Sequence, residues 1–233
     1  LGWGFNLRNC FFLKNRAHSG GAVAAYGVDM TGCIFDRNYA DKEGGALWLS
    51  EKNRIVHSLF MNNYSALEGG AISYDGYTRD TISNCIFVGN RAKTKGNWVA
   101  SMFGNNYIDH SYIDAKDCSS LKEGLDPVYD TLTCGPQLYF SDTDPMLRDT
   151  TGNDYRLSAC SPLLNQGDTT WLLRLGLHTD FAGQPRILDG LPDIGPYEIR
   201  LFRAAIAAQD VKCYGAADGQ IAALPLGGFP PFL

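Results

Sequence analysis

The sequence lacks any run of about 20 apolar residues, so no segment has the length of a membrane-spanning helix. Charged residues make up only 19% of the 233 positions, and the formal net charge is -5 with no block of basic residues. A mildly acidic chain of this kind argues against nucleic acid or an anionic membrane as its main partner. The chain also begins without a signal peptide, and we therefore expect it to be a fragment of a longer protein.

Motifs of several common catalytic sites are missing as well. The four histidines show neither H-E-x-x-H nor another paired spacing, and neither G-x-S-x-G nor the phosphate-binding G-x-x-x-x-G-K-[ST] occurs. The seven cysteines contain no C-x-x-C pair and do not follow the spacing of zinc sites. We therefore nominate no catalytic or cofactor-binding residue from the sequence.

One phrase recurs four times in the first half of the chain, and each copy carries Phe and, three residues later, Asn. The copies are spaced by 23, 25 and 27 residues, which is typical of the stacked coils of a solenoid. The two aligned columns are Phe12, Phe35, Phe60 and Phe87, and Asn15, Asn38, Asn63 and Asn90.

The other columns of the alignment also have a physical interpretation. A small residue two positions before each Phe predicts a strand that points both side chains into the coil. The Asn is expected at a turn, where it tolerates a left-handed conformation and can form an amide ladder between coils. The Gly-Gly pairs of three copies supply positive φ or room for close backbone approach. The small residues are Cys10, Cys33, Ser58 and Cys85.

These columns predict an all-β chain that forms a parallel β-helix over residues 1–117, with three short strands per coil. A fifth coil is expected around Tyr112 and Ile113. Leucine-rich repeats have a similar length and an Asn ladder, but their L-x-x-L-x-L-x-x-N frame is absent. The repeats resemble those of right-handed β-helices on bacterial surfaces, especially the G-G-A-I and F-x-x-N repeats of polymorphic membrane proteins and of secreted Bacteroidota proteins. This resemblance implies a right-handed parallel β-helix.

The repeat dissolves in residues 118–200, which we expect to form an irregular C-terminal cap. Four stretches resemble the choice-of-anchor segment that ends many secreted β-helix proteins, although Asn165 and Pro196 depart from the usual residues. The stretches are 154–157, 161–167, 180–186 and 193–198. An open β-helix end must be covered, and apolar residues of this segment could cover it. They are Leu157, Leu163, Leu164, Trp171, Leu172, Ile187, Ile194 and Tyr197.

Cys118 and Cys134 flank a loop outside the repeat and are a candidate disulfide. Cys160 is expected to pack inside the cap. Aspartates in the turns of the cap are candidate calcium ligands, because hard carboxylate oxygens suit this ion, although their spacing is not that of an EF-hand. Turn formation by the Asp side chains is the alternative interpretation. These aspartates are Asp142, Asp144, Asp149 and Asp154.

Residues 201–233 are expected to form a linker and the start of a β-sandwich-like repeat. They resemble the repeat found in tandem in gliding-motility adhesins of Bacteroidota, with Phe232 in place of the usual Tyr. The matching positions are Val211, Cys213, Gly215, Asp218, Gly219, Ile221, Gly227, Gly228 and Pro231.

Parallel β-helices also include polysaccharide lyases and hydrolases, which would place their catalytic groups on the outer face. Hydrolysis needs two carboxylates that flank the scissile bond, and the phrases typical of such hydrolases are absent. Outward-pointing charged candidates are Asp36, Arg37, Glu43, Glu68, Asp75, Arg79 and Asp80, with His18 and His57 nearby. Lyase chemistry would need a basic residue beside an acidic cluster, but the basic residues Arg91, Lys93 and Lys95 have no such cluster in register and are interpreted as a solvated turn. Aromatic residues that either stack on sugars or pack internally are Trp48, Tyr74, Tyr77, Trp98, Phe103 and Tyr107.

These resemblances imply a non-catalytic structural or recognition segment of a large secreted or cell-surface adhesin-like protein. The resemblance implies export by the type IX secretion system and a location at the exterior of the outer membrane. The implied partners are a surface glycan or another extracellular ligand and the other modules of the same long chain. A polysaccharide-active lyase or hydrolase and a carbohydrate-binding module are the open alternatives.

Overall fold

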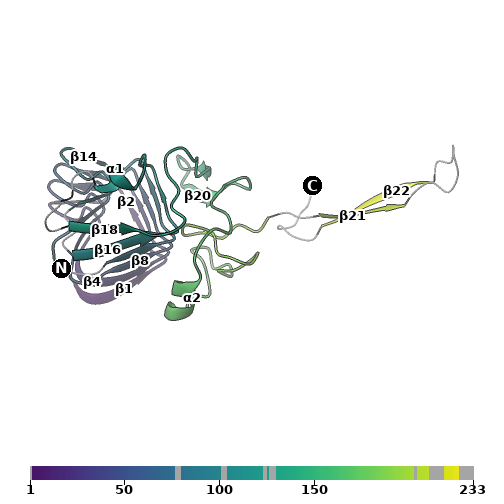
Figure 1. Ribbon diagram of the computed structural model, residues 1–233, viewed down its shortest axis with the longest axis horizontal. Coiled ribbons are helices and arrows are strands. Elements are labelled where there is room, and N and C mark those ends of the chain that lie inside the picture. Colours follow the sequence, from purple (N-terminus) through teal and green to yellow (C-terminus); the bar gives the residue numbers. More distant parts are fainter. Residues whose placement is uncertain are drawn as a thin grey trace. The chain divides into compact units, whose positions relative to one another are not determined.

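The computed structural model describes residues 2–76, 80–100, 104–122, 125, 130–201, 204–209 and 218–225. The chain divides into two compact units, Leu1–Glu198 and Ile199–Leu233. The first unit is a right-handed parallel β-helix of about five turns, with a further segment packed along its side (Figure 1). The fold class predicted from the repeat is confirmed.

Three parallel sheets form the walls of the β-helix. The first sheet contains β15 (Val99–Ala100), β11 (Ile72–Tyr74), β7 (Leu47–Ser50), β4 (Val23–Thr31), β8 (Arg54–Val56), β12 (Thr81–Ser83), β16 (Gly104–Asp109) and β18 (Asp130–Cys134), with β1 (Gly2–Arg8) paired to β4. The second contains β17 (Tyr112–Ile113), β13 (Ile86–Val88), β9 (Leu59–Met61), β5 (Ile34–Asp36) and β2 (Phe11–Leu13). The third contains β14 (Arg91–Ala92), β10 (Tyr64–Ser65), β6 (Tyr39–Ala40) and β3 (Arg16–Ala17).

The phenylalanine column forms a continuous stack inside the β-helix. The ring centroids of Phe12 and Phe35, Phe35 and Phe60, and Phe60 and Phe87 are 4.8, 4.9 and 4.8 Å apart, with nearly parallel planes. This distance is close to the spacing of neighbouring strands, so each coil adds one ring to the stack. The thiols of Cys33 and Cys85 are buried in the same core, whereas Cys10 is partly exposed.

The asparagine column forms a ladder of hydrogen bonds between coils. The Oδ1 atom of Asn63 accepts from the backbone N–H and from the Nδ2 atom of Asn38, at 3.0 and 2.9 Å, and the same pair of bonds joins Asn15 to Asn38 and Asn63 to Asn90. The positive φ expected for these residues lies one position earlier. It occurs at Lys14, Arg37, Asn62 and Gly89, with φ of 54°, 54°, 52° and 65°.

In each Gly-Gly pair, one glycine provides the positive φ and the other allows the close approach of two coils. The first glycine of each pair turns the chain with a positive φ, as in Gly44 at 67°. The second allows a close approach of two coils, because a Cβ atom added to Gly45 would clash with the carbonyl oxygen of Gly70. A pair is therefore needed where a single glycine could serve only one of the two purposes.

The coils continue beyond the expected end at residue 117. Strand β18 pairs in parallel with β16, and Tyr139 bridges Tyr112, so a further partial coil forms. Between these elements lies α1 (Cys118–Lys122), whose buried Leu121 packs into the main core. A disulfide joins Cys118 at the start of α1 to Cys134 at the end of β18. This disulfide-linked segment covers the core at the last coil.

Residues 142–198, here called the lateral segment, lie along the side of the β-helix (Figure 1). They contain β19 (Leu147–Asp149), β20 (Asp154–Leu157) and α2 (Thr170–Leu175). Their hydrogen bonds reach Arg8 in the first coil, Asp36 in the second, Asn84 in the fourth and Tyr139 in the last. Of the segment that was expected to cover an end of the β-helix, residues 142–198 therefore cover one of its faces, whereas the disulfide-linked part covers the core at the last coil.

The face that it covers is the outer face of the second sheet. Ile34, Leu59 and Ile86 point away from the core, yet all three are buried. A Cβ atom added to Gly195 would collide with the side chain of Ile86, which shows how closely the two layers approach. Five of the eight apolar residues assigned to the cap are buried and Trp171 and Tyr197 are partly exposed, but Ile187 and Cys160 are exposed.

The second unit contains a two-stranded antiparallel ladder in its described part. Strand β21 (Ala204–Gln209) pairs with β22 (Gln220–Pro225), and the side chain of Ile221 is 80% exposed. Of the positions that resemble the adhesin repeat, Asp218, Gly219 and Ile221 are described. The others lie outside the described residues: Val211, Cys213, Gly215, Gly227, Gly228, Pro231 and Phe232.

Candidate functional site

Several residues nominated from the sequence as outward-facing are buried. Asp36 is 1% exposed, because Arg37 and Tyr155 of the lateral segment's interface cover it, and the Tyr155 hydroxyl donates to its Oδ2 atom at 2.7 Å. His57 is fully buried between the first sheet and the lateral segment, and its Nε2 atom lies 2.9 Å from Nδ2 of Asn84. Burial, reinforced by the nearby charge of Arg186, lowers the pKa of His57 well below its usual value. These residues serve the interface and are not accessible to a ligand.

Asp80 belongs to a second polar ladder that the sequence analysis did not identify. The Oδ1 atom of Asn53 accepts from the N–H of Val28, Oδ1 of Asp80 accepts from the N–H of Asn53, and Oδ1 of Asn106 accepts from the N–H of Asp80. The spacing of 27 and 26 residues between these three side chains follows the repeat and could have revealed the ladder. The candidates Tyr77, Arg79 and Phe103 lie outside the described residues.

The carboxylates of the four candidate calcium ligands accept local hydrogen bonds, Asp142 and Asp144 before β19, Asp149 at the end of β19 and Asp154 at the start of β20. Asp149 accepts from the N–H groups of Thr151 and Gly152, and Asp144 accepts from the N–H of Met146. Asp154 forms an ion pair with Arg156 at 2.6 Å, and Asp142 accepts from the hydroxyl of Thr143. Within the described part of the chain, no group of three or more His, Cys, Asp or Glu residues is arranged to hold a metal ion.

The basic turn of the fourth coil and several aromatic candidates lie on other surfaces. Lys95 pairs with Glu68 of the preceding coil at 3.5 Å, while Arg91 and Lys93 are exposed. Tyr74 is buried, and Trp98 donates from Nε1 to Asp114.

A shallow hollow of about 360 Å³ brings together candidates from three different coils, and its lining includes His18, Glu43, Trp48 and Asp75.

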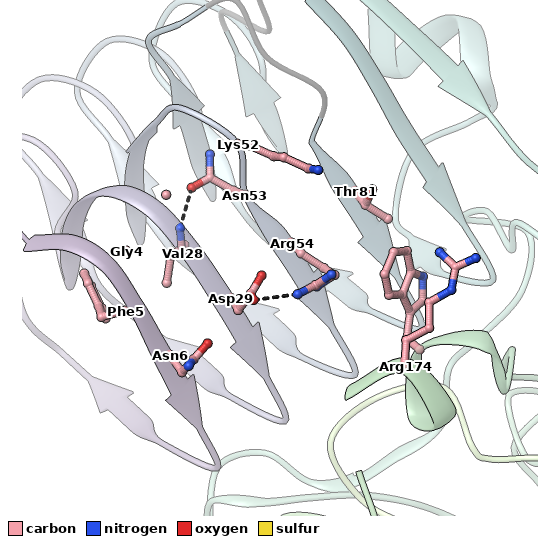
Figure 2. Close-up of a pocket in the computed structure, with 12 residues that line it drawn as sticks. Gly4, Phe5, Asn6, Val28, Asp29, Lys52, Asn53, Arg54, Thr81 and Arg174 are labelled. Carbon is pink, nitrogen blue, oxygen red and sulfur yellow. Dashed lines mark hydrogen bonds and ion pairs between the residues drawn. The ribbon is translucent and has the colours of Figure 1, made fainter. Parts of the chain in front are cut away.

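A groove of about 740 Å³ lies on the outside of the first sheet, as shown in Figure 2. Its floor is a row of side chains from four adjacent strands, because Asn6, Asp29, Arg54 and Thr81 are neighbours in register across β1, β4, β8 and β12. Lys52, just before β8, also lines it. The parallel stacking of the coils therefore places residues about 25 positions apart in sequence side by side.

One wall of the groove is provided by α2 of the lateral segment. This helix is anchored on Val56 of β8, against which Leu172 and Leu177 pack. Trp171 and Arg174 are three residues apart, so they lie on one face of the helix and point to the groove. Gly176, with φ of 59°, ends the helix and returns its N–H to the carbonyl of Leu172.

Two guanidinium groups gather around the Trp171 ring. The Cζ atoms of Arg54 and Arg174 lie 5.1 and 5.2 Å from the ring centroid, within the range of cation–π interactions. Arg54 also donates from Nη2 to Oδ2 of Asp29 at 2.5 Å. Among the described residues that line the groove, Lys52, Arg54 and Arg174 are cationic and Asp29 alone is anionic. The groove is thus locally basic in a chain of formal net charge -5.

A separate cluster of charges lies buried within the lateral segment. The guanidinium of Arg186 donates to Oε1 of Glu198 and to the carbonyl of Gly195, both at 3.0 Å, and each partner of this ion pair is 2% exposed at its side chain. The carboxylate of Glu198 also accepts from the N–H of Asp193, and the backbone N–H of Glu198 donates to Oδ2 of Asp180. Burial raises the pKa of Glu198 and lowers that of Arg186. These residues, which carry the choice-of-anchor resemblance, hold the segment together.

Searches with this chain against protein-family models, curated proteins and solved structures found no match. In the part of the chain that the structure describes, no helix is both long enough and apolar enough to cross a bilayer.

Proposed function

We propose that this chain is a non-catalytic recognition and structural segment of a large secreted or cell-surface adhesin-like protein. In this proposal the β-helix is a rigid rod that presents the groove on its first sheet to an extracellular ligand. Export by the type IX system and the relationship to gliding-motility adhesins are part of the proposal, and they rest on the sequence resemblances of residues 154–198 and 211–232.

The composition of the groove is the observation that carries the proposal. Asp29 is the single carboxylate among its described lining residues, and it is already paired with Arg54. Glycoside hydrolysis uses two carboxyl groups about 5 to 9.5 Å apart, one on each side of the scissile bond. A groove with cations, amides and one neutralised carboxylate supports binding better than hydrolysis.

The coils below the groove also favour a binding surface over a mobile catalytic site. The Asn ladder and the stack of Phe rings join successive coils, and parallel pairing holds the four strands of the groove floor in one register. Side chains on such a sheet have fixed spacings along the rod, so little conformational freedom is lost when an extended ligand binds.

The proposal is tested by incubating the purified chain with a panel of acidic and neutral polysaccharides, with and without calcium. Binding is followed by isothermal titration calorimetry, and turnover by new reducing ends and by the absorbance of unsaturated products. Binding without turnover is the expected result. Turnover of any polysaccharide would overturn the proposal and favour a β-helix lyase or hydrolase, the alternative that remains if the catalytic groups lie outside the groove.

A further inference from the structure

We propose that the ligand of the groove is an extended acidic polysaccharide, whose carboxylate or sulfate groups pair with Arg54, Arg174 and Lys52. This inference rests on the proposed recognition function and specifies the chemical class of the ligand. It draws on the charges, the aromatic ring and the length of the groove.

The distribution of charge is the first argument. Three cations line one groove of an otherwise acidic chain, and one carboxylate, Asp29, offsets only one of them. Cations gathered in this way repel each other, so the groove stabilises an anion that enters it. Arginine is suited to this role, because its planar guanidinium binds carboxylate and sulfate oxygens through two parallel hydrogen bonds.

The aromatic ring supports an anionic ligand over a neutral sugar. A neutral sugar binds best on an aromatic ring that is free for stacking. The Trp171 ring is instead in contact with the guanidinium groups of both Arg54 and Arg174. The ring therefore orients the two cations and lowers the entropy that they lose when they bind an anion.

The hydrogen bonding of Arg54 leaves part of its guanidinium for a ligand. Its Nη2 atom donates to Asp29 and its Nε atom is buried, but the side chain as a whole is 27% exposed, so a ligand can meet the exposed part of the guanidinium. Arg174 is exposed on α2, and Lys52 is exposed just before β8. Each of these cations can thus reach an anionic group in the groove without breaking a bond of the fold.

The length of the groove indicates a polymer. The row from Asn6 to Thr81 crosses four strands, which at about 4.8 Å per strand gives roughly 14 Å of polar floor. In register, Tyr107 of β16 continues the row beyond Thr81. A floor of this length can contact several sugar rings of an extended chain, and the side chains of Asn6 and Thr81 can bond to their hydroxyl groups.

The ligand test uses dextran sulfate and unmodified dextran, which share one backbone and differ in charge, together with polygalacturonate and a single-stranded oligonucleotide. Calorimetry of the full chain at low salt is expected to show binding of dextran sulfate and polygalacturonate and none of dextran. The affinity should fall as the salt concentration rises, because ion pairs are screened. Equal binding of dextran and dextran sulfate, or stronger binding of the oligonucleotide, would overturn the inference.

The variant test uses Lys52→Gln combined with Arg174→Gln, since both side chains are exposed and their loss should leave the melting temperature unchanged. We expect the double variant to bind the acidic polysaccharides at least 10-fold more weakly, because two charge-assisted contacts are lost. The matched control is Arg91→Gln, which removes an exposed arginine on β14 of the third sheet and should bind as the wild type does.

The outcomes separate the two proposals. Equal affinities of the double variant and the wild type, or equal losses in the double variant and in Arg91→Gln, would refute the groove as the acidic-ligand site while leaving a recognition function intact. Turnover of polygalacturonate with the predicted loss in the double variant would support the ligand class and refute the non-catalytic function. No binding to any polysaccharide would refute both.

Discussion

In the coils, a buried amide side chain bonds to the equivalent residue one coil away, whereas in the lateral segment a buried polar side chain such as that of Arg186 bonds to groups of a different type. Asn63 lies between Asn38 and Asn90, so one rule of bonding serves every coil. Arg186 instead bonds to Glu198 and to a backbone carbonyl. The contacts between coils can therefore be predicted from the alignment of a periodic sequence, whereas the contacts of an irregular segment become known only from the folded structure.

The coils and the lateral segment should also differ in how far a single substitution destabilises the structure around it. A residue of the stack contacts both neighbouring coils, so its loss weakens the rod as a whole. Arg186 of the charged cluster forms its hydrogen bonds within the lateral segment, so its loss should first release that segment from the second sheet. Four substitutions can break or sharpen this contrast.

The largest effect is expected for Phe60→Ala in the centre of the phenylalanine stack. Loss of a fully buried ring between Phe35 and Phe87 should lower the free energy of unfolding by about 3 to 5 kcal/mol, measured by urea denaturation. The matched control is Phe11→Ala, where the ring is 43% exposed on the outer face and the expected loss is about 1 kcal/mol. Similar losses at the two positions would contradict the internal stack.

Arg186→Met should have the next largest effect, about 3 kcal/mol, because it leaves the buried carboxylate of Glu198 without its ion pair. Hydrogen exchange should show lost protection in residues 142–198 before the coils open. Adding Glu198→Gln to the variant should recover part of the stability.

A matched control for this change is Arg156→Met in the same segment. Arg156 pairs with Asp154 at the surface, where an ion pair contributes about 0 to 1 kcal/mol. If Arg156→Met were as damaging as Arg186→Met, the buried cluster would not be what holds the segment together.

Asn63→Ala should cost about 2 kcal/mol, because it leaves the N–H of Asn38 and the carbonyl of Phe35 without hydrogen-bond partners inside the β-helix. Thermal and urea unfolding measure this loss. Asn62→Gly is the control, since Asn62 is exposed with φ of 52°, a conformation that glycine adopts freely. A change within about 0.5 kcal/mol is expected for the control.

The smallest effect is a pH dependence from His57. Its folded-state pKa is lowered, so below about pH 6.5 the unfolded chain binds a proton that the folded chain does not. Stability should therefore fall as the pH decreases below 6.5, with a slope of at most about 1.4 kcal/mol per pH unit from this group. His57→Asn should remove this part of the slope, because Asn does not titrate and already occupies the equivalent left-handed position at Asn84. The free energy of unfolding of both proteins is measured by urea denaturation at pH 5 and pH 7. An equal difference between the two pH values in the wild type and in His57→Asn would show that His57 is not involved.

The parallel β-helix could be predicted because each of its columns repeats at coil spacing. The columns of Phe and Asn coincide with the ring stack and the amide ladder of the structure. The second ladder, through Asn53, Asp80 and Asn106, repeats in the same way but mixes Asn with Asp, which concealed it in the alignment.

The position of the lateral segment had a weaker signal in the sequence. Ile34, Leu59 and Ile86 stand between an inward small residue and an inward Phe, where an exposed strand face would carry polar side chains. Their apolar character indicates that something covers the second sheet, but it does not identify the segment that covers it. Because the covering segment could not be identified from the sequence, Asp36 and His57 were expected at the surface, although both are buried in the structure.

The sequence by itself determined the coil, because a strand, its turns and its ladder depend on residues that recur with one period and meet their own equivalents in the next coil. Only the tertiary structure decided the groove. Arg54 and Trp171 are separated by more than 100 positions and follow no common period, and they meet because α2 packs on Val56. Contacts between a repeat and a non-repeating segment depend on shape and burial over many residues at once, which no local pattern encodes.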